Sequence, residues 1–136
     1  MSLTACHTHE DSATMKEARA VNEETTLLAR SFDQRSDMVR EDLVTRMAME
    51  ETPQEVKEKM EVVLSQLDDL EAQYQAWMSD QVLLPGAKCN HDHSEGEDHH
   101  HRASLDDLSD EDHLELQKAI RAELDKLVAT LNSLHL

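Results

Sequence analysis

The sequence predicts an all-α protein, a three-helix antiparallel bundle with a coiled-coil-like seam and a long histidine-rich loop before the third helix. Two observations favour this class. Aromatic residues are nearly absent, with one Phe, one Trp and one Tyr among 136 residues, whereas sandwiches, barrels and large α/β cores usually contain more. The two prolines and two glycines interrupt the chain in only two places, at Pro53 and between Pro85 and Gly96. We therefore expect a single helical domain over residues 1–136.

The first helix is expected over residues 12–51, with Ser12 as its N-cap. Apolar and small side chains then recur at steps of three and four, which is typical of the buried face of an amphipathic helix. This face consists of Ala18, Val21, Thr25, Leu28, Phe32, Ser36, Val39, Leu43 and Met47.

A second helix is expected over residues 53–82. Thr52 as N-cap, Pro53 at the first helical position and Glu55 at the third predict a capping box after a tight reversal. Apolar positions then alternate regularly by four and three residues, which is the pattern of a coiled-coil seam. The seam consists of Val56, Met60, Val63, Leu67, Leu70, Tyr74, Trp77 and Gln81.

Residues 83–103 have no apolar periodicity and are expected to form a loop, which is long for a compact domain. The last helical segment is expected over residues 104–135, with a short turn first and Ser109 opening the helix proper. Asp110, Glu111 and Asp112 complement the positive end of its dipole. Its apolar stripe is Leu116, Ile120, Leu124, Leu127, Leu131 and Leu134.

This order of helices predicts where the cysteines and histidines gather. If the second helix runs back along the first, the long loop lies at the end where the first helix begins, and the third helix starts there too. Eight of the nine histidines and both cysteines then belong to that end, while His135 alone belongs to the opposite end.

The most informative segment is Cys89–His101, which contains one thiol, five imidazoles and four carboxylates. Alternate residues of an extended chain point the same way, so Cys89, His91 and His93 can present three ligands to one ion. Nitrogen and sulfur donors suit zinc, nickel, cobalt or copper better than magnesium or calcium. The alternative interpretation is a solvated polar linker.

Further candidate ligands surround this triplet. A Cys again precedes histidines and acids near the N-terminus, and a run of three histidines is typical of tracts that capture metal loosely. These ligands are Cys6, His7, His9, His99, His100, His101 and His113, the last being equally compatible with an ordinary exposed helix position. The His- and Asp-rich tract resembles the metal-storing segments of nickel and zinc accessory proteins, and that resemblance implies nickel or zinc.

The charge of the chain narrows the classes of partner. A formal net charge of −17 argues against nucleic acid and anionic membrane surfaces, since no basic face could dominate it. No apolar run approaches the roughly 20 residues of a membrane span. No secretory signal is visible at the N-terminus, so a cytoplasmic protein is expected. No catalytic motif is present, and we do not expect an enzyme.

The sequence thus predicts a transition-metal-binding protein that acts as a metallochaperone, store or sensor, forms a homodimer and docks on a client protein. The alternative is a helical adaptor or assembly factor. Its partner would bind the seam of the second helix and an exposed apolar face, and the histidine-rich loop would be only a linker.

Overall fold

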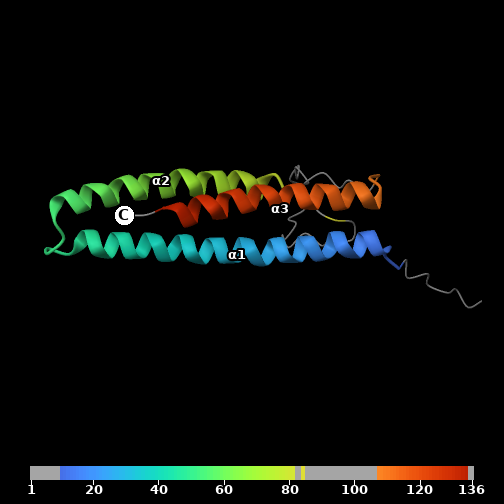
Figure 1. Cartoon of the computed structure of the whole chain (residues 1–136), viewed down its shortest axis with the longest axis horizontal. Coiled ribbons are helices and arrows are strands. Elements are labelled where there is room, and N and C mark those ends of the chain that lie inside the picture. Colours follow the sequence, from blue (N-terminus) through green and yellow to red (C-terminus); the bar gives the residue numbers. More distant parts are fainter. Residues whose placement is uncertain (1–9, 82–83, 85–106, 135–136) are drawn as a thin grey trace, which may run out of the picture.

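The computed structural model describes residues 10–81, 84 and 107–134. This part of the chain contains three helices and no strand: α1 (Ala13–Ala48), α2 (Gln54–Ser79) and α3 (Asp110–Ser133) (Figure 1). The predicted all-α class is confirmed. Within the same residues, no helix is both long enough and apolar enough to cross a membrane.

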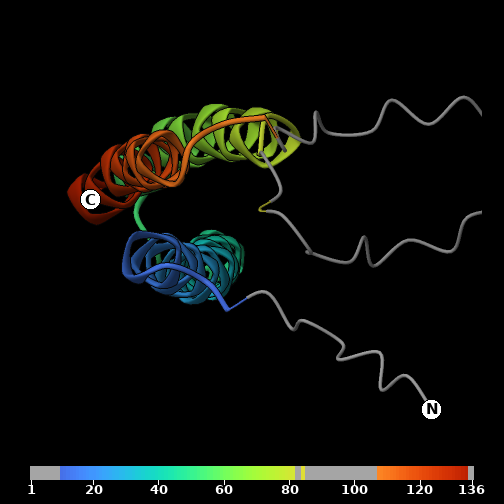
Figure 2. The ribbon, with the colours of Figure 1, turned by 90° about the vertical axis from the view of Figure 1, so that its right-hand side faces the viewer.

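The helices run up, down and up. α1 and α3 are parallel, since Arg121 Nη1 lies 3.0 Å from Glu24 Oε2 and Arg35 contacts Asn132 further along both helices. α2 runs in the opposite direction, since Tyr74 bonds to Asp33 while Asp68 pairs with the later residue Arg40. Seen from one end, the three axes occupy the corners of a triangle (Figure 2).

The helices are staggered along α1, which has 36 residues against 26 in α2 and 24 in α3. We call the end where α1 and α3 begin the base, and the end where α1 turns into α2 the top. α2 stops short of the base and α3 stops short of the top (Figure 1). The bundle therefore has three helices in its middle and two at either end.

Each level has its own apolar cluster. The middle cluster draws on all three helices and comprises Ala29, Phe32, Leu67, Leu70, Tyr74, Trp77, Leu124 and Leu131. The top cluster is Leu43, Met60 and Val63, from α1 and α2. The base cluster is Met15, Ala18 and Leu114, from α1 and α3, together with Leu84 from the chain beyond α2.

The predicted seam of α2 lies inside the bundle. All of its positions from Met60 to Trp77 are buried, and the terminal positions Val56 and Gln81 are half-buried. In the first helix, five of the nine predicted positions are buried and the others are half-buried. Regular steps of three and four thus identified the core faces correctly, because the helix period fixes which side chains share a face.

The predicted start of α2 is wrong in detail. Thr52 does not cap α2; its hydroxyl donates to the carbonyl of Arg46 at 2.7 Å and closes the end of α1. Pro53 occupies the N-cap position without a side-chain hydrogen bond. α1 ends at Ala48 rather than residue 51, because the backbone of Met49 is already extended. α2 ends at Ser79, three residues before the predicted end.

α3 begins where the predicted cap at Ser109 places it. Asp107, Leu108 and Ser109 precede the helix, and the Ser109 hydroxyl accepts from the Asp112 amide at 3.1 Å, so that α3 begins at Asp110. The predicted residues 104–106 lie outside the described residues. Ser12 caps α1 as predicted, accepting from the Met15 amide at 3.0 Å.

Candidate functional site

Three described parts of the chain lie together at the base: the start of α1, Leu84 and the start of α3. The Ser12 hydroxyl contacts the Asp110 carboxylate, which joins the N-cap of α1 to the first turn of α3. Leu84 packs with Met15 and Leu114. Residues 1–9 and 85–106 are therefore connected to the bundle at one end, as the order of helices predicted.

His113 is the one predicted ligand among the described residues, and it is buried rather than exposed. It lies on the second turn of α3 with 1% of its surface accessible. Its ring nitrogens Nδ1 and Nε2 have no hydrogen-bond partner within the described part of the chain. The interpretation of His113 as an ordinary exposed helix residue is wrong.

Gln117, one turn further along α3, is buried to the same degree. Its Oε1 accepts from Asn22 Nδ2 of α1 at 3.1 Å, whereas its Nε2 has no partner among the described residues. The sequence prediction missed Gln117 because the stripe of α3 was traced through apolar residues only. It began at Leu116, which is half-buried. The alternating steps of four and three from His113 through Gln117 and Ile120 to Leu124 are the available signal.

α2 ends before it reaches the level of His113. Trp77 Nε1 donates to the Ile120 carbonyl at 3.1 Å, which places the last turn of α2 beside Ile120. α2 ends two residues later, while His113 lies about 10 Å closer to the base along α3 at 1.5 Å per residue. His113 thus belongs to the two-helix layer, where Leu84 takes the place of a third helix.

The base carries excess negative charge. Carboxylates of Glu10, Asp107, Asp110, Glu111 and Asp112 belong to it, and of these Glu10 pairs with Lys16 at 3.6 Å. The parallel N-termini of α1 and α3 add positive partial charge that several of these carboxylates offset. A cation approaching the base meets acidic groups, which favours its accumulation there.

The remaining predicted ligands lie outside the described residues: Cys6, His7, His9, Cys89, His91, His93, His99, His100 and His101. Among residues 10–81, 84 and 107–134, no group of three His, Cys, Asp or Glu side chains is arranged to hold a metal ion.

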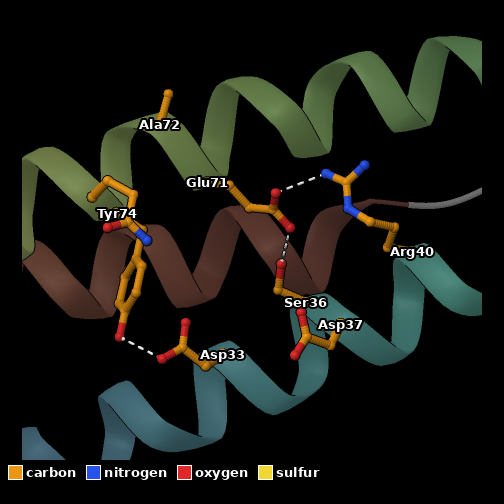
Figure 3. A pocket seen from close by; sticks show the side chains of 8 residues that line it. Asp33, Ser36, Asp37, Arg40, Glu71, Ala72 and Tyr74 are labelled. Atoms are coloured by element: carbon orange, nitrogen blue, oxygen red, sulfur yellow. Dashed lines mark hydrogen bonds and ion pairs between the residues drawn. The ribbon is translucent and has the colours of Figure 1, made fainter.

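A second polar feature, a cleft of about 310 Å³, lies between α1 and α2 (Figure 3). Arg40 Nη2 is 2.6 Å from Asp68 Oδ1 and 2.7 Å from Glu71 Oε2. The Ser36 hydroxyl donates to the other oxygen of Glu71 at 2.6 Å. The Tyr74 hydroxyl lies 3.1 Å from Asp33 Oδ2. These contacts join side chains of α1 to side chains of α2 across the cleft.

The electrostatics of the cleft follow from these contacts. Burial, the negative charge of Asp33 and the hydrogen bond to it raise the pKa of Tyr74 from 10.0 to about 12. Hydrogen bonds to Asp68 and Glu71 raise the pKa of Arg40, which keeps its positive charge. We interpret the cleft as a polar clamp that holds α2 on α1. Sequence reasoning missed it, although Ser36 within an apolar stripe was a signal, since a core hydroxyl needs a partner.

Comparison with known proteins yields no relative. No protein-family model matches the chain, and neither curated proteins nor solved structures provide a match. The function must therefore be inferred from the residues themselves.

Proposed function

We propose that this protein binds a divalent transition metal ion, nickel or zinc before cobalt or copper, at the base of the bundle. Its role would be that of a metallochaperone, store or sensor. The core ligands would be Cys89, His91 and His93, with Cys6, His7 and His9 closing the site and His99, His100 and His101 capturing ions.

The observation that carries the proposal is the meeting of chain segments at the base. Ser12 contacts Asp110, and Leu84 packs against Met15 and Leu114. Both Cys- and His-bearing segments are thus attached to the same end of a rigid support, even though about 80 residues separate Cys6 from Cys89 in sequence. Without this arrangement, two short polar segments would have no reason to share an ion.

The surroundings support a cationic ligand. The chain carries 30 acidic residues against 13 basic ones, and the carboxylates near the starts of α1 and α3 concentrate this charge at the base. Thiolate and neutral imidazole are the donors that zinc and nickel prefer. Because ligation joins segments that are far apart in sequence, its free energy would add to the stability of the bundle.

The test is a calorimetric titration of the reduced, metal-stripped chain with zinc, nickel, cobalt and copper ions in turn. We expect submicromolar binding that saturates at about one ion per chain or per pair of chains. A double variant, Cys89→Ser with His91→Ala, should lose this binding. His135→Ala is the matched control, because residue 135 follows Leu134, which packs on the top cluster. Equal binding by the double variant and the wild type would refute the ligand assignment.

Two further parts of the function remain proposals: a homodimer and a client protein. The seam of α2 is not free to serve either partner, because Leu67 and Leu70 are at most 1% exposed within the single chain. The apolar side chains left at the surface include Leu27 and Met38, which lie 11 residues apart on α1. An 11-residue spacing returns to nearly the same side of a helix.

Because these exposed apolar side chains could bind a partner, the adaptor role is a second candidate function. Met38 is 68% exposed, so Met38→Asp should leave the stability of the bundle almost unchanged. Sedimentation of wild type and variant with and without a metal chelator separates the two functions. A dimer lost on Met38→Asp but indifferent to chelator favours the adaptor, whereas a dimer lost with chelator alone favours the metal protein.

A further inference from the structure

His113 differs from the other buried polar side chains of the described chain in having no partner. The Thr25 hydroxyl donates to the Val21 carbonyl at 2.7 Å, and the Ser36 hydroxyl donates to Glu71. Both nitrogens of His113 are without a hydrogen bond among the described residues, at 1% exposure. Buried polar groups in native proteins are almost always paired, so an unpaired imidazole in a core calls for an explanation.

The position of His113 supplies one. The ring lies in the base layer, next in sequence to Leu114, and in the part of the bundle that α2 does not reach. Leu84, the described residue that adjoins residues 85–106, packs in that layer. A neutral imidazole nitrogen is a preferred ligand of zinc and nickel, and it binds them without carrying a buried charge of its own.

We propose that His113 is the interior ligand of the metal site, and that its ligation couples metal occupancy to the packing of α3 on α1. This inference rests on the proposed function and deepens it. Among chaperone, store and sensor, it selects a sensor, because the bound ion would alter the helical core rather than only the segments outside it.

Gln117 provides the link from the ligand to α1. A metal-bound histidine usually donates its other ring N–H to a neighbouring oxygen, which fixes the orientation of the ring. Gln117 lies one turn from His113 on the same face of α3, and its Oε1 already accepts from Asn22 of α1. That oxygen has a second lone pair for the imidazole N–H. Ligation would thereby complete a chain of contacts from the ion through His113 and Gln117 to Asn22.

The experiment measures the melting temperature of the full chain, reduced and metal-stripped, with and without added Zn²⁺. The variant is His113→Leu, and the matched control is Thr25→Val, which also replaces a buried polar side chain by an apolar one of similar size. Circular dichroism verifies that each protein is helical. If His113→Leu melts too low to measure, His113→Phe, which keeps a ring in place, repeats the test.

Wild type and Thr25→Val should each gain roughly 5–10 °C at Zn²⁺ concentrations well above the Kd. His113→Leu should still bind Zn²⁺ in the calorimeter through the ligands outside the core, roughly tenfold more weakly, but without the gain in melting temperature. A full gain in His113→Leu would overturn the inference and leave the proposed function standing. Absence of calorimetric binding by the wild type would overturn both.

Discussion

The two ends of the bundle have the same architecture and different contents. At the top, α1 and α2 enclose Leu43, Met60 and Val63, and no polar side chain among the described residues is buried there. At the base, α1 and α3 enclose Met15, Ala18 and Leu114 together with His113 and Gln117. Because a two-helix layer can be filled with apolar side chains alone, the polar pair at the base is not a requirement of the fold.

The connections at the two ends also differ, both in length and in the side chains that they carry. The top closes within the few residues from Met49 to Pro53, where the Thr52 hydroxyl and amide bond back to α1 and the turn. At the base, the chain between Leu84 and Asp107 is much longer and carries most of the histidines. A short, satisfied turn serves stability, whereas a long segment rich in metal-ligating side chains indicates function.

The largest expected effect tests whether the top is simply a packed core. Leu43→Ala should lower the free energy of unfolding by about 3 kcal/mol, since it removes a side chain that is 3% exposed. Val44→Ala is the control on the same helix, because Val44 is 53% exposed and should cost less than about 0.5 kcal/mol. Urea unfolding of both variants measures the difference. Equal losses would contradict the packing of the top cluster.

The next largest expected effect is a loss of stability at alkaline pH, and it concerns Tyr74, whose hydroxyl is hydrogen-bonded in the middle of the bundle. The folded chain holds the pKa of Tyr74 at about 12, whereas an unfolded tyrosine ionises near 10. Above pH 10 the unfolded chain therefore binds fewer protons than the folded chain. The stabilisation is complete below about pH 10 and is lost as pH rises towards 12, by on the order of 2 kcal/mol.

This pH dependence can be measured directly, because Tyr74 is the single tyrosine of the chain. Tyrosinate absorbance should titrate with a midpoint near pH 12 in the folded protein. Tyr74→Phe should remove this share of the alkaline loss of stability and should itself cost about 1 kcal/mol at neutral pH, since Ala29 and Asp33 lose a donor. A midpoint at the ordinary value would show that the hydroxyl is not buried against Asp33.

The smallest expected effect is a gain in the free energy of unfolding, and it concerns the unpaired polar group at the base. His113→Leu should raise the stability of the metal-free chain by about 1 kcal/mol, because it removes ring nitrogens that have no partner in the described core. Thr25→Val replaces a hydroxyl that is already bonded and should not stabilise. Urea unfolding in the presence of chelator gives both values. A loss of stability in His113→Leu would mean that the ring already has favourable contacts.

The sequence was sufficient for the arrangement of the helices and insufficient for the polar contacts. The heptad spacing from Val56 to Gln81 identified the buried side of α2, and the caps at Ser12 and Ser109 located two helix starts, because both depend on local chemistry. The role of Thr52 was predicted wrongly. Its hydroxyl was expected to cap the start of α2, but it donates to the Arg46 carbonyl at the end of α1.

The site could be predicted only in part. The shared location of the starts of α1 and α3 followed from the number and direction of the helices. The burial of His113 did not, because a search for apolar periodicity passes over a polar residue in a core position. The clamp of Arg40, Asp68 and Glu71 also escaped prediction, because charged residues beside a seam usually remain solvated.

The central claim is that metal binds at the base and not at the top. Amide hydrogen exchange of the full chain, with and without an equivalent of Zn²⁺, tests it most directly. Added metal should slow exchange most in the first turns of α1 and α3, residues 13–25 and 110–117, and in residues 43–63 only by as much as the whole fold is stabilised. Protection spread evenly over all three helices, or none in the first turns of α1 and α3, would contradict a metal site at the base.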